Sequence, residues 1–324
     1  MHESVKIGIS GVRGVVGQSF TPQLACSFAQ AFGCLVGQGQ VVVGRDTRPS
    51  GRMIEQAVVA GLQSVGCRPV LAGIIPTPTI LYLTRALGAR GGIAITASHN
   101  EAPWNALKFA DRDGMFLDPI QADELFDIYH QRDFAFIRES DIRPVKTEKH
   151  ATDGHFQKVV NYVDAAAIRE RAFKVAVDCC NGVGALHTVN FLEQHFGCSV
   201  VPLFDQPTGD FERGPEPAPE HLGALSQIVT AHGCDIGFAQ DPDGDRLAIV
   251  DEQGVPIGED MSLAFAIQQV LKAHEQGPVV CNVSVGRKIR DAMKQQNREL
   301  ILTPTGEIHV SKKLVEIGGV VGGE

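Results

Sequence analysis

Short apolar runs alternate with helix-like patterns along most of this chain. Residues 40–44 (QVVVG) are typical of a buried strand, and residues 53–65 then carry apolar side chains at helical spacing. Residues 68–72 and 91–96 predict further strands, with a helix over residues 77–87 between them. Strands that alternate with helices of this length indicate an α/β fold with a largely parallel sheet.

The same rhythm returns twice in the rest of the chain. It predicts strands over residues 173–178, 199–204, 234–239, 278–285, 300–303 and 318–321, and helices near residues 187–195, 221–232, 287–296 and 308–316. We therefore expect three related α/β units, over residues 1–150, 151–255 and 256–324. The first boundary is expected in the mixed-charge stretch 131–150, and the second within residues 251–260.

Composition narrows the classes of function. The 324 residues include 38 acidic and 29 basic ones, so the net charge is −9. This balance argues against a nucleic-acid or membrane-surface partner, but it leaves room for a local basic pocket that binds a small phosphorylated ligand. No apolar run approaches the roughly 18 residues of a membrane span, and no secretory signal is visible, so a cytoplasmic location is expected. The eight cysteines form no CxxC and are expected to be reduced, buried thiols.

Polar loops follow the last strand of each predicted unit. They are Thr96-Ala97-Ser98-His99-Asn100, the acidic loop at residues 241–246, and Gly322-Gly323-Glu324. In parallel α/β sheets, ligands gather at the carboxyl ends of the strands. The three loops are therefore expected to face one cleft.

The acidic loop carries Asp241, Asp243 and Asp245 within five residues. Three carboxylates so close together repel one another, and a divalent cation would relieve the repulsion. Oxygen ligands alone favour Mg²⁺, Ca²⁺ or Mn²⁺ over zinc. An EF-hand is disfavoured, because Arg246 stands where its sixth position needs Gly and the flanking residues are strand-like. A solvated acidic turn is the remaining alternative.

Ser98 offers a hydroxyl in a loop of small residues. A serine hydrolase would need GxSxG, and both glycines are missing. His99 is adjacent in sequence, which is a poor position for the base of its own neighbour. From the residues alone, an ordinary loop serine stays open beside a nucleophile.

Basic residues also lie in glycine-rich or polar loops, namely Arg13, Arg45, Arg48 and Lys108. Each could bind a phosphate group, or each could form a surface ion pair. No GxxxxGK[ST] is present and no GxGxxG follows a strand, so ATP and NAD are not indicated.

Taken together, these stretches resemble the α-D-phosphohexomutase family of phosphoglucomutases, phosphomannomutases and phosphoglucosamine mutases. The matching segments, in the family's order, are SGVRG (10–14), VGRDTRPSG (43–51), TASHN (96–100), WNALKF (104–109), DPDGDRLAIVDEQG (241–254), TPTGE (303–307) and GGE (322–324). The resemblance implies tandem three-layer α/β/α domains with mixed sheets, two complete (1–150 and 151–255) and a third incomplete (256–324), with no fourth domain. WNALKF and TPTGE are most similar to archaeal-type phosphoglucosamine mutases.

The resemblance also implies roles for the candidate residues. Ser98 would carry a phosphoryl group, and Asp241, Asp243 and Asp245 would hold one Mg²⁺ per active site together with an oxygen at Ser98. The implied catalytic set is Ser98, His99, Lys108, Arg13 and Arg246, with Lys108 and Arg13 in acid–base work and Arg246 offsetting charge in the transition state. The implied substrate-binding set is Arg45, Asn100, Gly306, Glu307, Gly323 and Glu324.

The implied reaction interconverts hexose 6-phosphate and hexose 1-phosphate, or their hexosamine counterparts. A hexose bisphosphate forms as the intermediate, reorients, and also primes the serine. The protein is expected to be a monomer or a homodimer.

Two features depart from the family pattern. Asn100 is followed by Glu101 rather than by proline, which places an extra carboxylate near a phosphate site. The chain also ends at Glu324, where the family continues through the rest of domain III and a fourth domain, so a C-terminal truncation is expected. Two other hypotheses therefore stay open, a weakly active or inactive fragment that binds phosphosugar and metal, and a phosphosugar phosphatase.

Overall fold

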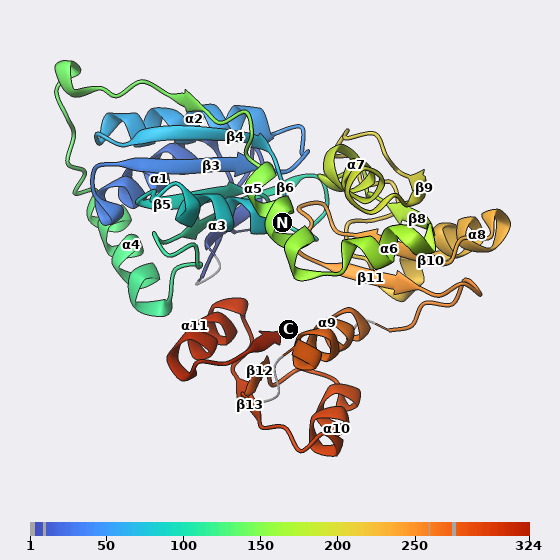
Figure 1. Cartoon of the computed structure of the whole chain (residues 1–324). Coiled ribbons are helices and arrows are strands. Elements are labelled where there is room, and N and C mark those ends of the chain that lie inside the picture. The colour runs from blue at the N-terminus through green and yellow to red at the C-terminus, as the bar shows by residue number, and fades with distance from the viewer. Residues whose placement is uncertain (1–3, 9–10, 259, 274–276) are drawn as a thin grey trace. The chain divides into compact units, whose positions relative to one another are not determined.

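The computed structural model describes residues 4–8, 11–258, 260–273 and 277–324. The chain forms two compact units, Met1–Val255 and Pro256–Glu324. The first unit holds a seven-stranded and a four-stranded sheet, and the second unit holds a three-stranded sheet (Figure 1).

The seven-stranded sheet is parallel at its centre and antiparallel along one side. Its strands, in spatial order, are β1 (Lys6–Gly8), β2 (Gly11–Val15), β6 (Trp104–Ala110), β5 (Gly91–Ile95), β3 (Gln40–Arg45), β4 (Arg68–Ile74) and β7 (Lys146–Thr147). β3 pairs in parallel with β4 and β5, and β4 pairs in parallel with β7. From β5 outward, β6, β2 and β1 each pair with the preceding strand in antiparallel register. The helices of this part are α1 (Pro22–Val36), α2 (Gly51–Ser64), α3 (Thr77–Ala86) and α4 (Pro119–Gln131), with a 3₁₀ turn η1 (Glu139–Asp141).

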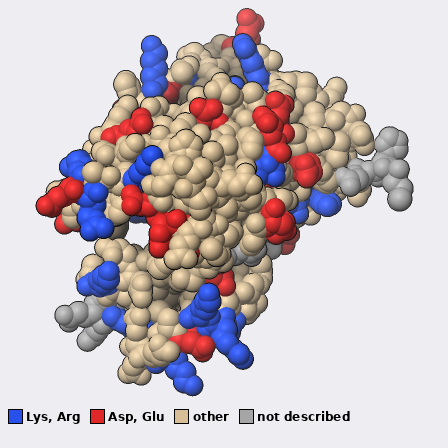
Figure 2. Space-filling model, turned by 90° about the vertical axis from the view of Figure 1, so that its right-hand side faces the viewer, with Lys and Arg blue, Asp and Glu red and all other residues tan. Residues whose placement is uncertain are grey.

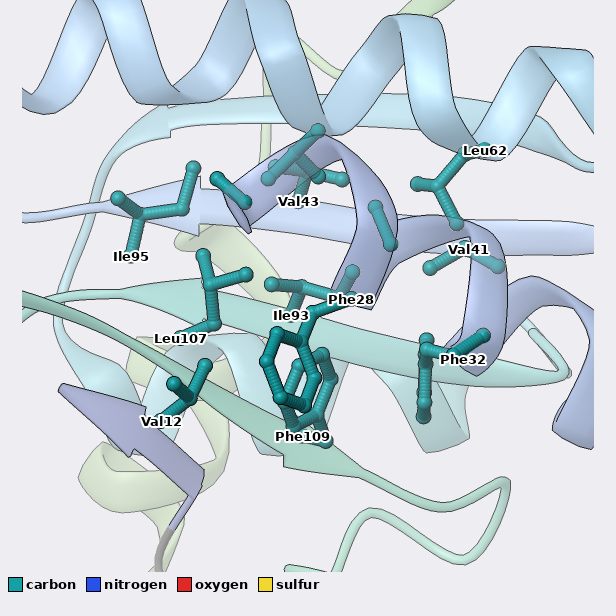
Figure 3. Packing of buried hydrophobic residues seen from close by; sticks show 14 of the residues in the cluster. Val12, Phe28, Phe32, Val41, Val43, Leu62, Ile93, Ile95, Leu107 and Phe109 are labelled. Atoms are coloured by element: carbon teal, nitrogen blue, oxygen red, sulfur yellow. The ribbon is translucent and has the colours of Figure 1, made fainter. Parts of the chain in front are cut away.

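Side-chain alternation along β3 divides the core between the two faces of this sheet. Val41 and Val43 lie in one cluster with Phe28 of α1 and Leu62 of α2 (Figure 3). Val42 lies between them and belongs to a second cluster with residues of α3. Helices therefore cover both faces of this sheet.

The four-stranded sheet repeats this plan with an antiparallel edge. Its strands, in spatial order, are β11 (Leu247–Val250), β10 (Ile236–Gln240), β8 (Lys174–Asp178) and β9 (Ser199–Leu203). β8 pairs in parallel with β10 and β9, whereas β11 pairs with β10 in antiparallel register. The accompanying helices are α5 (Asp153–Tyr162), α6 (Ala165–Arg171), α7 (Gly184–Phe196) and α8 (Gly223–His232), with a 3₁₀ turn η2 (Pro219–His221). α8 packs in one core cluster, and α5 to α7 contribute to another.

The second unit has a small sheet in which both strand pairs are parallel. Its spatial order is β13 (Leu300–Thr303), β12 (Val279–Asn282) and β14 (Val321–Gly323). The helices are α9 (Met261–Ala273), α10 (Arg287–Gln295) and α11 (Glu307–Ile317). Ile267, Leu271, Ile289 and Met293 pack from α9 and α10 against β12 to form a separate hydrophobic core.

The predicted α/β class and the predicted order of strands and helices are confirmed. The strand predicted over residues 318–321 is wrong in position, because Gly318 ends α11 in the left-handed conformation and β14 begins only at Val321. The sequence patterns did not predict β1, β2, β6, β7, α4, α5, α6 or α9. The boundaries proposed at residues 150 and 255 stay predictions.

The distribution of surface charge and the state of the cysteines can be compared with the expectations from composition. On the face shown in Figure 2, acidic and basic side chains are interspersed rather than gathered into one charged patch. All eight cysteines are free thiols, six of them buried and two partly exposed. Burial raises the pKa of Cys179 and Cys180 to about 12. No helix among the described residues is both long and apolar enough to cross a membrane.

Candidate active site

Two loops of the first unit meet at Ser98. One follows β5 and carries Ser98, and the other follows β10 and carries Asp241. The Ser98 hydroxyl donates a hydrogen bond of 2.9 Å to Asp241 Oδ2. Two of the three polar loops that were expected to face one cleft are therefore in direct contact. That the loop at residues 322–324, which belongs to the second unit, faces the same cleft stays a prediction.

The backbone of Ser98 is held in a strained conformation. Its φ is 47°, in the left-handed region that residues other than glycine rarely adopt. The Ser98 N–H donates to Thr96 Oγ1 at 2.9 Å, and the Ser98 carbonyl accepts from Arg48 at 2.7 Å. The surrounding structure thus fixes the backbone that presents the hydroxyl to Asp241.

Arg48 is the centre of that support. Its guanidinium is fully buried and pairs with Asp46 at 3.0 Å. The other nitrogens donate to four backbone carbonyls along the loop, those of Ser98, Asn100, Glu101 and Trp104. The sequence suggested that Arg48 binds a phosphate group or forms a surface ion pair, and both interpretations are wrong. All its donors are used inside the protein, and its ion pair is buried.

The acidic loop forms a compact cluster of carboxylates. Asp241, Asp243 and Asp245 each offer an oxygen within 4.8 Å of the others. Thr77 donates to Asp243 Oδ2 at 2.7 Å, and Lys108 Nζ lies 3.3 Å from the same oxygen. Asp243 Oδ1 is buried and has no hydrogen-bond partner among the described residues. The cluster therefore keeps a buried acceptor that its own neighbours leave unsatisfied.

The close carboxylates of the cluster shift one another's pKa values. Burial, with the carboxylates of Asp243 and Asp245, raises the pKa of Asp241 well above its usual range. Burial also acts to raise the pKa of Asp243, but Lys108, the neighbouring Asp241 and Thr77 outweigh it and lower that pKa to about 2. A divalent cation would relieve the repulsion and satisfy the free oxygen. Because strands flank the loop, β10 before it and β11 after it, an EF-hand is excluded.

Three predicted basic residues lie in different surroundings. Lys108 of β6 lies 3.2 Å from Asp245 Oδ2, and so joins the acidic cluster. Arg13 of β2 donates to Asn100 Oδ1 at 3.3 Å, at the end of the serine loop. Arg45 Nε instead lies 3.8 Å from Glu55 Oε1. The predicted substrate role of Arg45 stays a prediction.

His99 and Arg246 are connected through a residue that the sequence did not single out. His99 Nδ1 lies 3.3 Å from Ser98 Oγ and 3.8 Å from a carboxylate oxygen of Glu216. Arg246 places one nitrogen 2.7 Å from both oxygens of the same carboxylate. Burial and the nearby Arg246 lower the pKa of His99. The available signal was a single acidic residue between two prolines, Pro215 and Pro217.

The second unit brings its own predicted residues together. Glu324 Oε2 accepts hydrogen bonds from Gly306 N–H at 2.9 Å and from Asn282 Nδ2 at 2.8 Å. Glu307 begins α11 directly after Gly306, and Gly323 lies in β14 beside Glu324. Asn282, at the end of β12, was not predicted from the sequence.

Three family profiles match this chain in succession. They are described as phosphoglucomutase/phosphomannomutase, alpha/beta/alpha domain I over residues 4–136, domain II over residues 153–254 and domain III over residues 259–324.

Individual relatives agree with the profiles. A "Phosphoglucomutase/phosphomannomutase" of Thermococcus kodakarensis is 36% identical, over 98% of this chain and 70% of its own length. A "Probable phosphoglucosamine mutase" of Methanopyrus kandleri is 36% identical, over 98% of this chain and 69% of its own length. The crystal structure of a phosphoglucomutase/phosphomannomutase family protein from Burkholderia thailandensis has a TM-score of 0.85 at 29% identity, covering 98% of this chain and 71% of that one.

Proposed function

Because this chain belongs to the phosphoglucomutase/phosphomannomutase family, we propose that it interconverts hexose 6-phosphates and 1-phosphates through a phosphoserine at Ser98. The chain is a phosphohexomutase, an isomerase that acts as an intramolecular phosphotransferase. The observation that carries the phosphoserine proposal is the contact between the Ser98 hydroxyl and Asp241 inside the carboxylate cluster.

The carboxylate cluster fits a resident Mg²⁺. Asp241, Asp243 and Asp245 would hold the ion together with an oxygen at Ser98, and Asp243 Oδ1 is a buried acceptor that a cation would satisfy. When bound, Mg²⁺ would polarise the phosphoryl group and offset its negative charge. Oxygen donors without sulfur or imidazole suit Mg²⁺ better than zinc.

The chain's own residues would move the phosphoryl group. In the forward half-reaction, the bond between Ser98 Oγ and phosphorus breaks as a sugar hydroxyl forms a new bond to phosphorus. The proton of that hydroxyl passes to a base, and Ser98 Oγ regains a proton. Lys108 and Arg13 are the proposed acid–base groups, because Arg13 contacts Asn100 of the serine loop and Lys108 contacts Asp243 of the acidic loop. The reverse half-reaction returns the other phosphate of the bisphosphate to Ser98.

Each unit carries its own candidate residues for binding the sugar phosphate. In the first unit, Asn100 and Arg45 are the candidates, and Arg246 would offset charge on the transferred phosphoryl group. In the second unit, Glu324 would accept hydrogen bonds from sugar hydroxyls, with Gly306, Glu307 and Gly323 shaping the same loop region. The relatives' names favour a hexosamine or mannose phosphate as the substrate.

Phosphorylation of Ser98 tests this proposal directly. The protein is incubated with glucose 1,6-bisphosphate and Mg²⁺, and the phosphorylated residue is mapped by peptide mass spectrometry. We expect phosphate on Ser98, none in Ser98→Ala, and little in Asp243→Asn. Absence of phosphate on Ser98 in the natural sequence would overturn the mechanism.

A second assay follows the sugar. Phosphorus NMR of glucosamine, mannose and glucose 6-phosphates, each with a trace of bisphosphate, reports formation of the 1-phosphate. We expect isomerisation of at least one of these sugars. Release of inorganic phosphate without isomerisation would show the phosphatase activity instead.

A further inference from the structure

Glu216 lies on a loop that is anchored from behind. Arg213 and Asp178 form a buried ion pair, with 2.7 Å between Nε and Oδ2 and exposures of 2% and 0%. The same Arg213 donates to the Glu216 carbonyl at 3.0 Å, and His221 Nδ1 lies 2.8 Å from that carbonyl. Because Pro217 follows, the backbone of Glu216 is also restricted to extended conformations. The position of Glu216 is therefore fixed by the fold.

The carboxylate of Glu216 faces the serine loop. Both of its oxygens lie 2.7 Å from one nitrogen of Arg246, and one lies 3.8 Å from His99 Nδ1. The Arg246 and Glu216 side chains are 44% and 35% exposed. An ion pair with this exposure contributes little to stability, so its value lies in the geometry that it holds.

The contacts close a ring around the Ser98 hydroxyl. His99 Nδ1 lies 3.3 Å from Ser98 Oγ on one side. On the other side, Ser98 Oγ donates to Asp241 Oδ2. The backbone N–H of Arg246 donates to the other oxygen, Asp241 Oδ1, at 3.0 Å. Glu216 joins the two sides, because it contacts both His99 and the Arg246 side chain.

We propose that Glu216 is a positioning residue that holds the Arg246 guanidinium and the His99 ring beside Ser98 for phosphoryl transfer. An unpaired arginine side chain samples many rotamers, and only those near Ser98 can offset charge on the phosphoryl group. Glu216 touches neither Ser98 nor the sugar in this role, and it acts through its two neighbours. The inference rests on the proposed function, since it concerns the same serine.

Single-turnover phosphorylation of Ser98 by glucose 1,6-bisphosphate tests the role. We expect Glu216→Gln to slow transfer by about tenfold to a hundredfold, which is less than the roughly hundredfold to thousandfold loss when a charge-stabilising donor itself is removed. The bisphosphate concentration at half-maximal rate should change less than about twofold, because ground-state binding is retained. The unfolding midpoint should hardly move. Glu220→Gln, which changes an exposed glutamate four residues away, is the matched control and should transfer at the unmodified rate.

A double variant separates positioning from an independent effect. If Glu216 acts mainly through Arg246, Glu216→Gln combined with Arg246→Ala should be no more than about twofold slower than Arg246→Ala alone. If the double variant were instead slowed by the product of the factors found for Glu216→Gln and Arg246→Ala separately, the inference would be overturned. A Glu216→Gln rate equal to that of the unmodified protein while Ser98 still takes phosphate would also overturn it, and the proposed function would then stand.

NMR of the arginine side chains gives a readout that does not depend on catalysis. The Nε–Hε proton of Arg246, whose signal is assigned with Arg246→Lys, should exchange slowly with solvent in the unmodified protein. In Glu216→Gln the same proton should exchange faster. The buried Arg48 signal should persist in both proteins and serves as the internal control. An unchanged Arg246 signal would overturn the positioning role. Absence of phosphate on Ser98 in the unmodified protein would overturn the proposed function instead.

Discussion

Arg48 supports the serine loop through one buried side chain, and Arg48→Met removes that support. The substitution keeps an unbranched apolar stem but deletes five side-chain hydrogen bonds, one to Asp46 and four to backbone carbonyls. It also leaves the Asp46 carboxylate, which is 1% exposed, without its counter-ion. We therefore expect the loss of stability to come from an uncompensated buried charge and from carbonyls that lose their donor.

The expected size follows from the burial. Removing one partner of a buried ion pair costs about 3–5 kcal/mol, whereas an exposed pair contributes about 0–1 kcal/mol. Arg48 and Asp46 have fully buried side chains, so the larger range applies. Arg48→Lys should lose at least about 2 kcal/mol, because one ammonium group cannot reach four carbonyls at once.

Urea unfolding followed by fluorescence measures this loss. Trp104 is the chain's single tryptophan, and its carbonyl accepts from Arg48, so its emission reports on the unit that contains the loop. Arg138→Met is the control, because Arg138 and its partner Asp141 are 89% and 51% exposed. That variant should stay within about 0.5 kcal/mol of the unmodified protein. If Arg48→Met destabilised the protein no more than Arg138→Met does, the reasoning would be refuted.

Three further predictions concern other parts of the fold. Gly209 and Gly73 both have φ of 75°, but a Cβ on Gly209 would lie 2.5 Å from the Thr47 carbonyl oxygen while one on Gly73 meets nothing within 4 Å. Gly209→Ala should therefore cost about 1–3 kcal/mol more than Gly73→Ala in urea unfolding, and equal losses would contradict the clash. Burial lowers the pKa of His155 and His187 below the usual 6.5, so the folded protein binds fewer protons than the unfolded one and stability should fall as pH drops below about 6.5. A variant carrying His155→Gln and His187→Gln should lose less stability between pH 7 and pH 5, and an undiminished slope would count against this assignment. The six buried cysteines should react with a thiol reagent at pH 8 only after unfolding, and rapid modification of more than two thiols in the native protein would show that the burial is wrong.

Local sequence signals were sufficient for the order of the elements. The apolar run at residues 40–44 became β3 because a buried parallel strand needs apolar side chains on both faces. The acidic loop could be predicted in the same way, since three carboxylates within five residues repel one another unless a cation binds them. β6 was missed as a strand because Asn105 and Lys108 interrupt its apolar run, and because one of its antiparallel partners, β2, lies far away in the sequence. The same segment, WNALKFA, carries Lys108 to the acidic cluster.

By itself, the sequence determined the α/β class, the pairing of a serine loop with an acidic loop, and the family that this pairing indicates. Tertiary structure decided how the charged side chains are divided between support and chemistry. Arg48 and Arg13 lie in similar short stretches next to glycine, but Arg48 is buried and donates to four carbonyls, whereas Arg13 is exposed on β2 beside Asn100. The position of Glu216 depends on Arg213, three residues earlier, which pairs with the distant Asp178 and donates to the Glu216 carbonyl. The physical reason is that burial and the distances between groups in the folded chain decide which charged side chains pair. The local pattern of residues determines neither of these.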